Sequence, residues 1–251
     1  MKFKLLMAAT AVSILLSREV KAQAGLFDVH VNVGYGFAAG MGSLISYTGS
    51  EQTTVPYSLG AGLNLDLGAA YMLSDHIGVG LDLSDIMGTA IKYNEIGNQV
   101  VKNEELTGMM YAATPMIILS ANPDGISPYG KFGLVLGAAS FTRTETESGI
   151  LAHSGTYIDT YSGDLALGLY GALGIRFPLS DKVGLTVELF DRTVSYAPTT
   201  LTNTQPYDND KANNTITFTD TVDNSTANNT ANKVYWPFSS AGVKVGVTVN
   251  L

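Results

Sequence analysis

Histidine, serine and carboxylate side chains are the residues of this chain that could do catalytic chemistry. The chain has three histidines and no cysteine. The nearest approach to a nucleophile–base–acid arrangement is His153-Ser154 together with Glu145 or Glu147. Each histidine falls in a different segment, so the three cannot meet, and a solvated loop histidine is far commoner than a catalytic one. We therefore expect no catalytic site.

The composition narrows the classes of protein to which the chain can belong. The absence of cysteine excludes disulfides, thiolate metal sites and a lipid anchor through Cys, and no cofactor motif is found. Removing residues 1–24 takes away four basic side chains and one acidic side chain, which changes the formal charge from −8 to −11. A chain this acidic has no general attraction to nucleic acid.

The first 24 residues have the pattern of a secretory signal peptide. Lys2 and Lys4 precede a short apolar stretch over residues 5–16, and Ala22-Gln23-Ala24 fits the small-x-small cleavage pattern. Cleavage after Ala24 leaves residues 25–251 as one domain, and cleavage after Ala22 stays open as an alternative. The apolar stretch is shorter than the roughly 20 residues that a membrane-spanning helix needs.

Strict alternation of apolar with polar or small residues characterises the rest of the chain. The last nine residues show it clearly, because successive side chains of a strand point to opposite faces. The residues of the apolar row in that final segment are Val243, Val245, Val247, Val249 and Leu251. The same period predicts eight strands, over residues 27–38, 56–72, 76–92, 106–119, 128–142, 162–177, 183–196 and 234–251.

Short and long connections alternate between these strands. The turns at residues 73–76, 120–127 and 179–182 are short, whereas the connections at 39–55, 93–105, 143–161 and 197–233 are long. This arrangement is typical of an all-β, eight-stranded antiparallel up-and-down transmembrane barrel with short periplasmic turns and long extracellular loops. A soluble sandwich or lipocalin-like barrel is the alternative, but the second row, rich in glycine and charge, would make a poor solvent face.

Two further features refine the predicted barrel. Tyr57 and Tyr71 lie fourteen residues apart on the apolar row of one strand, which is the spacing of an aromatic girdle at the two membrane interfaces. Pro115 cannot donate a ladder hydrogen bond, so we expect a bulge or a local break there.

Several segments resemble the outer-membrane β-barrel domain family, which is related to the OmpA- and OmpX-like small barrels. They are residues 179–188, 73–79 and 127–131 and the terminal strand. Together with a signal ending in Lys21-Ala22-Gln23-Ala24, they look like a protein of Bacteroidota. Such barrels usually end in Phe, and this chain ends in Leu251. The resemblance implies that the terminal strand carries the signal read by the barrel-assembly machinery.

A barrel of eight strands has a lumen just wide enough for side chains, so charged residues inside it should form a paired network. The predicted inward residues are Asp28, His30, Asp66, Asp82, Lys131, Asp164, Arg176, Glu188 and Lys244. Arg176 and Glu188 flank one short turn, so we expect them to face each other.

The predicted function is an integral outer-membrane barrel with a structural and surface-interaction role. We expect a lumen filled by polar side chains. A narrow porin-like channel is the first alternative, and a lipid A-modifying enzyme is the less favoured second. Expected partners are outer-membrane lipid and lipopolysaccharide, the assembly machinery and periplasmic chaperones. A host or surface ligand could bind through the polar loop at 197–233.

Overall fold

The computed structural model describes residues 27–39, 42–48, 51–96, 100–121, 125–149, 155–205, 215–220 and 229–251. Every regular element in these ranges is a β-strand. None of the described residues belongs to a helix long and apolar enough to cross a bilayer. The signal peptide predicted over residues 1–24 lies outside the described residues, as does His153.

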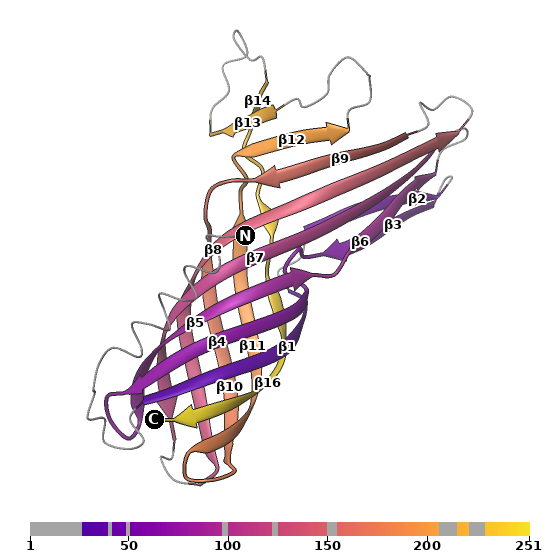
Figure 1. Ribbon diagram of the computed structural model, residues 1–251. Coiled ribbons are helices and arrows are strands. Elements are labelled where there is room, and N and C mark those ends of the chain that lie inside the picture. The colour runs from indigo at the N-terminus through magenta and orange to yellow at the C-terminus, as the bar shows by residue number, and fades with distance from the viewer. Residues whose placement is uncertain are drawn as a thin grey trace.

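Eight strands form a closed antiparallel barrel, as the alternation predicted (Figure 1). Each of these eight strands pairs with the next one of the eight along the chain, and β16 closes the barrel by pairing with β1. The barrel strands are β1 (Phe27–Ala38), β4 (Gly62–Met72), β5 (Ile77–Gly88), β7 (Val100–Ser120), β8 (Ser127–Gly149), β10 (Ala166–Pro178), β11 (Val183–Tyr196) and β16 (Ser240–Asn250).

The register of the ladders fixes the shape of the barrel. The row of paired residues that starts at Asp28 passes through all eight strands and returns to β1 at Ala38, ten positions further along. With ~3.3 Å per residue and ~4.8 Å between strands, this stagger tilts the strands by about 40°. The run from Phe27 to Phe37 therefore rises about 25 Å along the barrel axis, the height of a typical apolar band.

One end of the barrel, here called the turn end, carries the short connections. In the turns after β4 and β10, Leu73 and Leu179 donate backbone hydrogen bonds to Ile77 and Val183, at 2.8 Å each. The last residue of the chain lies at the same end, where the Leu251 amide donates to the Phe27 carbonyl at 2.9 Å. The repeated Leu-Ser-Asp sequence thus builds two equivalent tight turns.

The opposite end continues as an open sheet, here called the extension. Because β7 and β8 run for 21 and 23 residues, they project beyond the barrel and carry further strands on each side (Figure 1). These are β6 (Ile91–Ile96), β2 (Gly42–Thr48) and β3 (Glu51–Tyr57) beside β7, and β9 (Gly155–Ser162), β12 (Thr200–Gln205), β13 (Thr215–Thr219) and β14 (Thr230–Asn232) beside β8. A two-residue strand, β15 (Trp236–Pro237), pairs with the end of β11.

The extension corrects the prediction that the four long connections are loops. Each of them contains strands in its described part. Three of the four are rich in Thr, which suits strands. Their apolar residues are few, such as Leu44 of β2, Ile91 of β6 and Ile216 of β13, and these pack against the core. The runs are too short to give the long alternation that identified the barrel strands.

The predicted bounds fit some barrel strands better than others, and β4 and β16 each begin six residues later than predicted, at Gly62 and Ser240. The bounds of β1 and β11 match the prediction, and β7 and β8 are longer than predicted because they continue into the extension. At Pro115 the pairing of β7 with β8 stops after Ala113 and resumes at Met116 in the same register. The predicted interruption is therefore a local break and not a bulge.

The outward face of the barrel is a continuous apolar belt. Aliphatic and aromatic side chains on every barrel strand are exposed, among them Val31, Leu67, Leu81, Ile117 and Phe132. A monomeric soluble protein rarely exposes an apolar surface larger than a few hundred Å². A belt that runs around the whole barrel is instead the surface that lipid covers in a membrane barrel.

Candidate functional site: the layered interior of the barrel

Buried ion pairs form a charged layer across the middle of the barrel interior. Lys244 Nζ lies 2.6 Å from Asp66 Oδ2, and Lys131 Nζ lies 2.6 Å from Glu188 Oε1. Both pairs are almost completely buried. Charges taken out of water in this way must be paired and hydrogen-bonded. Tyr129 completes the second pair by donating its hydroxyl to Glu188 at 2.7 Å.

His30 lies between two carboxylates at the turn-end side of this layer. Its Nε2 lies 2.8 Å from Asp82 Oδ1, and its Nδ1 lies 3.5 Å from Asp28 Oδ1. A carboxylate accepts hydrogen bonds, so the short contact with Asp82 places a proton on Nε2. His30 thus lies between Asp28 and Asp82 and donates to Asp82.

The sequence-based pairing of Arg176 with Glu188 is wrong. Arg176 contacts Asn250 and approaches Asp28 at 3.8 Å, whereas Glu188 binds Lys131. Arg176 and Glu188 both point into the lumen, but Arg176 lies opposite Thr186, next to the turn, and Glu188 lies opposite Gly174, two positions further from the turn. Asp164, also predicted inside, is exposed before β10, where its side chain accepts the Leu165 amide at 2.9 Å.

Arg192 belongs to the charged layer and was missed. It is 1% exposed, donates to Asn64 Oδ1 at 2.7 Å and lies over the rings of Phe190 and Tyr170. Lys244 lies over the same two rings. The inward row of β11 also holds Phe190 and an aliphatic residue, so the row did not look polar. Arg192 lies four residues after Glu188 on one strand, so the alternation of side chains places both on the inward face and would have identified Arg192.

An apolar plug closes the interior between the charged layer and the extension. Two chain segments enter the barrel mouth there, and Leu59 and Phe238 are both 0% exposed. The Leu59 amide donates to the Pro237 carbonyl at 2.9 Å, which joins the two segments, and the Phe238 amide donates to the Val194 carbonyl of β11 at 3.0 Å. The side chains packed around them include Ile86, Leu106, Met110, Val135, Phe141 and Tyr196.

Gly60 and Gly108 show how closely the plug fits. A Cβ on Gly60 would lie 2.1 Å from the Phe238 carbonyl oxygen, and one on Gly108 would lie 2.8 Å from Leu59 Cβ. Only residues without a side chain allow the two segments to approach each other and β7 so closely. The plug is therefore a packed part of the fold.

Tyr57 belongs to this plug, and its predicted place in an aromatic girdle is wrong. It is 8% exposed, and its ring meets the ring of Trp236 edge to face at 6.3 Å. The chain turns back at residues 58–61, where the Ala61 amide donates to the Ser58 carbonyl. Because of this turn, Tyr57 does not share the outward face of β4, although the alternation in the sequence had placed it on the same apolar row. Tyr71 does lie on the outward face, 42% exposed, near the turn end.

The residues predicted as an assembly signal lie on the outer surface of β16. Their exposed fractions run from 38% at Val249 to 60% at Leu251. The row faces away from the lumen and forms part of the apolar belt.

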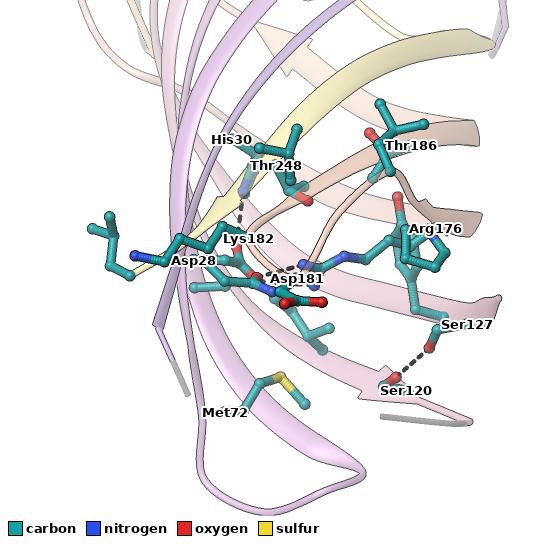
Figure 2. A pocket seen from close by; sticks show the side chains of 18 of the residues that line it. Asp28, His30, Met72, Ser120, Ser127, Arg176, Asp181, Lys182, Thr186 and Thr248 are labelled. Atoms are coloured by element: carbon teal, nitrogen blue, oxygen red, sulfur yellow. Dashed lines mark hydrogen bonds and ion pairs between the residues drawn. The ribbon is translucent and has the colours of Figure 1, made fainter. Parts of the chain in front are cut away.

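A cavity of about 730 Å³, here called the vestibule, lies between the charged layer and the turn end. Residues of the charged layer and the turns line it, including Asp28, His30, Lys131, Arg176 and Thr248. Figure 2 shows Arg176 and His30 both directed at Asp28, with the Ser120–Ser127 hydroxyl pair at the side of the cavity. Residues of two turns, Asp75, Asp181 and Lys182, line its turn-end side, and the charged layer separates it from the plug.

The extension carries a second charge cluster on the continuation of the inward face. Arg143 Nη2 lies 2.7 Å from Asp159 Oδ2, and Lys102 Nζ lies 3.3 Å from Glu145 Oε1. Tyr93 donates its hydroxyl to Glu104. Burial and the Glu104 carboxylate raise the pKa of Tyr93 above its usual value. Among the described residues, no group of His, Asp and Glu is arranged to hold a metal ion.

No protein-family model matches the chain, and no curated protein is significantly similar to it. Its fold is similar to that of a major outer membrane protein from Thermus thermophilus, at 13% identity and a TM-score of 0.52, covering 92% of this chain and 100% of that one. OprG from Pseudomonas aeruginosa is 11% identical, with a TM-score of 0.45 and coverages of 93% and 99%. The first likeness shows the fold, a small closed barrel.

Proposed function

We propose that the protein is an integral outer-membrane β-barrel with a closed lumen and a structural and surface-interaction role. The observation that carries the proposal is the layered interior, in which buried ion pairs and the apolar plug fill the barrel beneath the extension. The apolar belt supports a place in a membrane. The similar Thermus protein, which is an outer membrane protein, supports the choice of the outer membrane.

In the proposed orientation the turn end faces the periplasm and the extension faces the outside of the cell. Short turns on one side and long connections on the other are the usual arrangement of such barrels. Lipid and lipopolysaccharide would then surround the belt. The β16 row would be read by the assembly machinery, with periplasmic chaperones acting during transit. The extension, including β12 and β13 of the 197–233 region, would present the surface that meets a host or surface ligand.

Introduced cysteines test the orientation without background, because the natural chain has none. Thr53→Cys places a thiol on exposed β3, and Asp181→Cys places one in the exposed turn after β10. In intact cells a membrane-impermeant maleimide should label the first variant and should label the second only after the outer membrane is permeabilised. Labelling of Asp181→Cys alone in intact cells would reverse the proposal.

The surface-interaction role is tested by removing part of the extension. A chain with residues 200–232 replaced by a short Gly-Ser linker keeps all eight barrel strands, so it should still fold and show a heat-dependent shift on gels. Cells carrying it should adhere less to surfaces than cells carrying the full chain at equal expression. Equal adhesion would contradict the role proposed for this region.

A further inference from the structure

The vestibule has buried polar groups that no protein group satisfies. Asn32 Nδ2 and Thr248 Oγ1 are buried and have no hydrogen-bond partner, although both residues line the cavity. Asn32 is 2% exposed and Thr248 is 6% exposed. Buried donors left without a partner are costly, so groups placed in this way indicate that something polar is received there.

The free groups of the vestibule favour a ligand that accepts hydrogen bonds. Asn32 Nδ2 is a donor, the Thr248 hydroxyl can donate, and Lys131 has donors beyond the one that Glu188 takes. The charged side chains that line the cavity are close to balanced, with His30, Lys131, Arg176 and Lys182 against Asp28, Asp75 and Asp181. A carboxylate offers acceptors alone, so it matches these free donors.

The cavity walls differ from one side to the other. Ala70, Met72 and Ile118, from β4 and β7, make an apolar wall. Polar residues of β1, β11 and β16, namely Asn32, Thr186 and Thr248, line another part of the cavity, and Figure 2 shows Thr186 above Arg176 and Thr248 beside His30. A ligand that suits both walls has a charged or polar head and a short apolar tail. The cavity volume is within the range of small-molecule sites.

We propose that the vestibule binds a small carboxylate with a short apolar tail. Its carboxylate accepts hydrogen bonds from Asn32 Nδ2, from the Thr248 hydroxyl and from the spare donors of Lys131, while its tail lies against Ala70 and Ile118. The ligand enters from the turn end, which is the periplasmic side if the proposed orientation is right. The binding itself does not depend on that orientation.

Butyrate, its neutral analogue butyramide and the cationic butylamine are suitable probes of similar size. They are titrated by calorimetry into the purified full chain in detergent, with protein-free micelles as the blank. Butyrate should bind saturably, butyramide at least about tenfold more weakly, and butylamine not at all. Equal binding of butyrate and butyramide, or no saturable binding of butyrate, would overturn the proposal.

Variants locate the site. Asn32→Asp replaces the free donor with a negative charge and should weaken butyrate binding by about tenfold or more. Thr248→Val removes one hydroxyl at constant shape and should weaken it several-fold. Thr114→Val is the matched control, because Thr114 is buried in the same lumen but does not line the vestibule.

A heat-dependent gel shift shows whether each variant is folded. If Asn32→Asp does not fold, the comparison of Thr248→Val with Thr114→Val decides alone, and an equal loss in both would place butyrate elsewhere. These titrations use purified protein, so their failure is distinct from a failure of the cysteine labelling in cells.

Discussion

The inward face of β8 carries ion pairs in two environments, the barrel and the extension, which differ in how far they bury the charges. In the barrel, Lys131 of β8 binds Glu188 at 2.6 Å, and the two side chains are 6% and 1% exposed. In the extension, Glu145 of β8 binds Lys102 at 3.3 Å, and these side chains are 12% and 31% exposed. The chemistry is the same, but the closed barrel removes water from its pairs and the open sheet does not.

This difference in burial should decide how much each ion pair contributes to the stability of the fold. A buried pair is held in place by the cost of stranding either partner, whereas a partly exposed pair is screened by solvent and contributes little. We therefore expect single substitutions in the charged layer to destabilise the whole barrel, and equivalent substitutions in the extension to act locally.

The largest effect is expected from Lys244→Met. It leaves Asp66, whose side chain is 0% exposed, without its partner and should lower the free energy of unfolding by about 3–5 kcal/mol. Urea unfolding in micelles, followed by the fluorescence of Trp236, measures this; it is the single tryptophan of the chain. The double variant Lys244→Met/Asp66→Asn should regain most of the loss. Unchanged stability of the single variant would show that the charged layer is hydrated.

A somewhat smaller effect is expected from Phe238→Ala in the apolar plug. Removing a fully buried ring leaves a cavity and should cost about 3 kcal/mol. Leu134→Ala, on the outward face of β8, is the control, and it should cost clearly less because detergent or lipid refills the space. Equal losses in the two variants would mean that the plug is loosely packed.

Arg143→Ala tests the extension. Its side chain is 35% exposed and its guanidinium lies between Asp159 and Glu104, so its loss should cost about 1–2 kcal/mol, between the values for exposed and buried pairs. Hydrogen exchange should speed up in β9 and leave β1 and β16 unchanged. Faster exchange throughout the barrel would show that the extension and the barrel unfold together.

The smallest effect is expected at the exposed contact of Lys233 with Asp164, where Nζ and Oδ2 are 3.3 Å apart. The Leu165 amide and Lys233 lower the pKa of Asp164, and Asp164 and Asp220 raise the pKa of Lys233. The contact therefore contributes above the ordinary Asp pKa of 3.8 and below the ordinary Lys pKa of 10.5. It is lost as the pH falls below or rises above that window.

Hydrogen exchange of the Leu165 amide, corrected for its intrinsic rate, measures the contact. Protection should be constant inside the window and fall at acid pH. Asp164→Asn should remove this pH dependence and lower the protection at neutral pH. A wild-type amide whose protection did not change with acid would contradict the assignment.

The eight barrel strands could be predicted because their outward row is apolar on every strand. The parity of that row also placed His30, Asp82 and Lys131 on the inward face. Pairing could not be read in the same way, since the partner of a charge depends on the stagger of ten residues around the barrel. Arg176 and Glu188 were paired by their nearness in sequence, but the β10–β11 register sets Arg176 opposite Thr186 and Glu188 opposite Gly174.

The plug and the extension were beyond prediction for different reasons. Leu59 continues the alternation of β4, so nothing before the turn at residues 58–61 shows that it enters the lumen. Phe238 lies in the strand predicted over residues 234–251, but ahead of its regular alternation, so the pattern gives no sign that its ring enters the lumen. In the extension, the added strands have eight residues or fewer and few apolar side chains, as in β6 and β13, so their periodicity carries little signal.

Planar-bilayer conductance of the purified full chain tests the central claim, which is that side chains block the lumen of the barrel. The ion pairs of Lys131 and Lys244 and the packing of Leu59 and Phe238 predict no resolved current steps above the bare bilayer. Reproducible single-channel steps from the same preparation would contradict the account and show that ions pass through the plug.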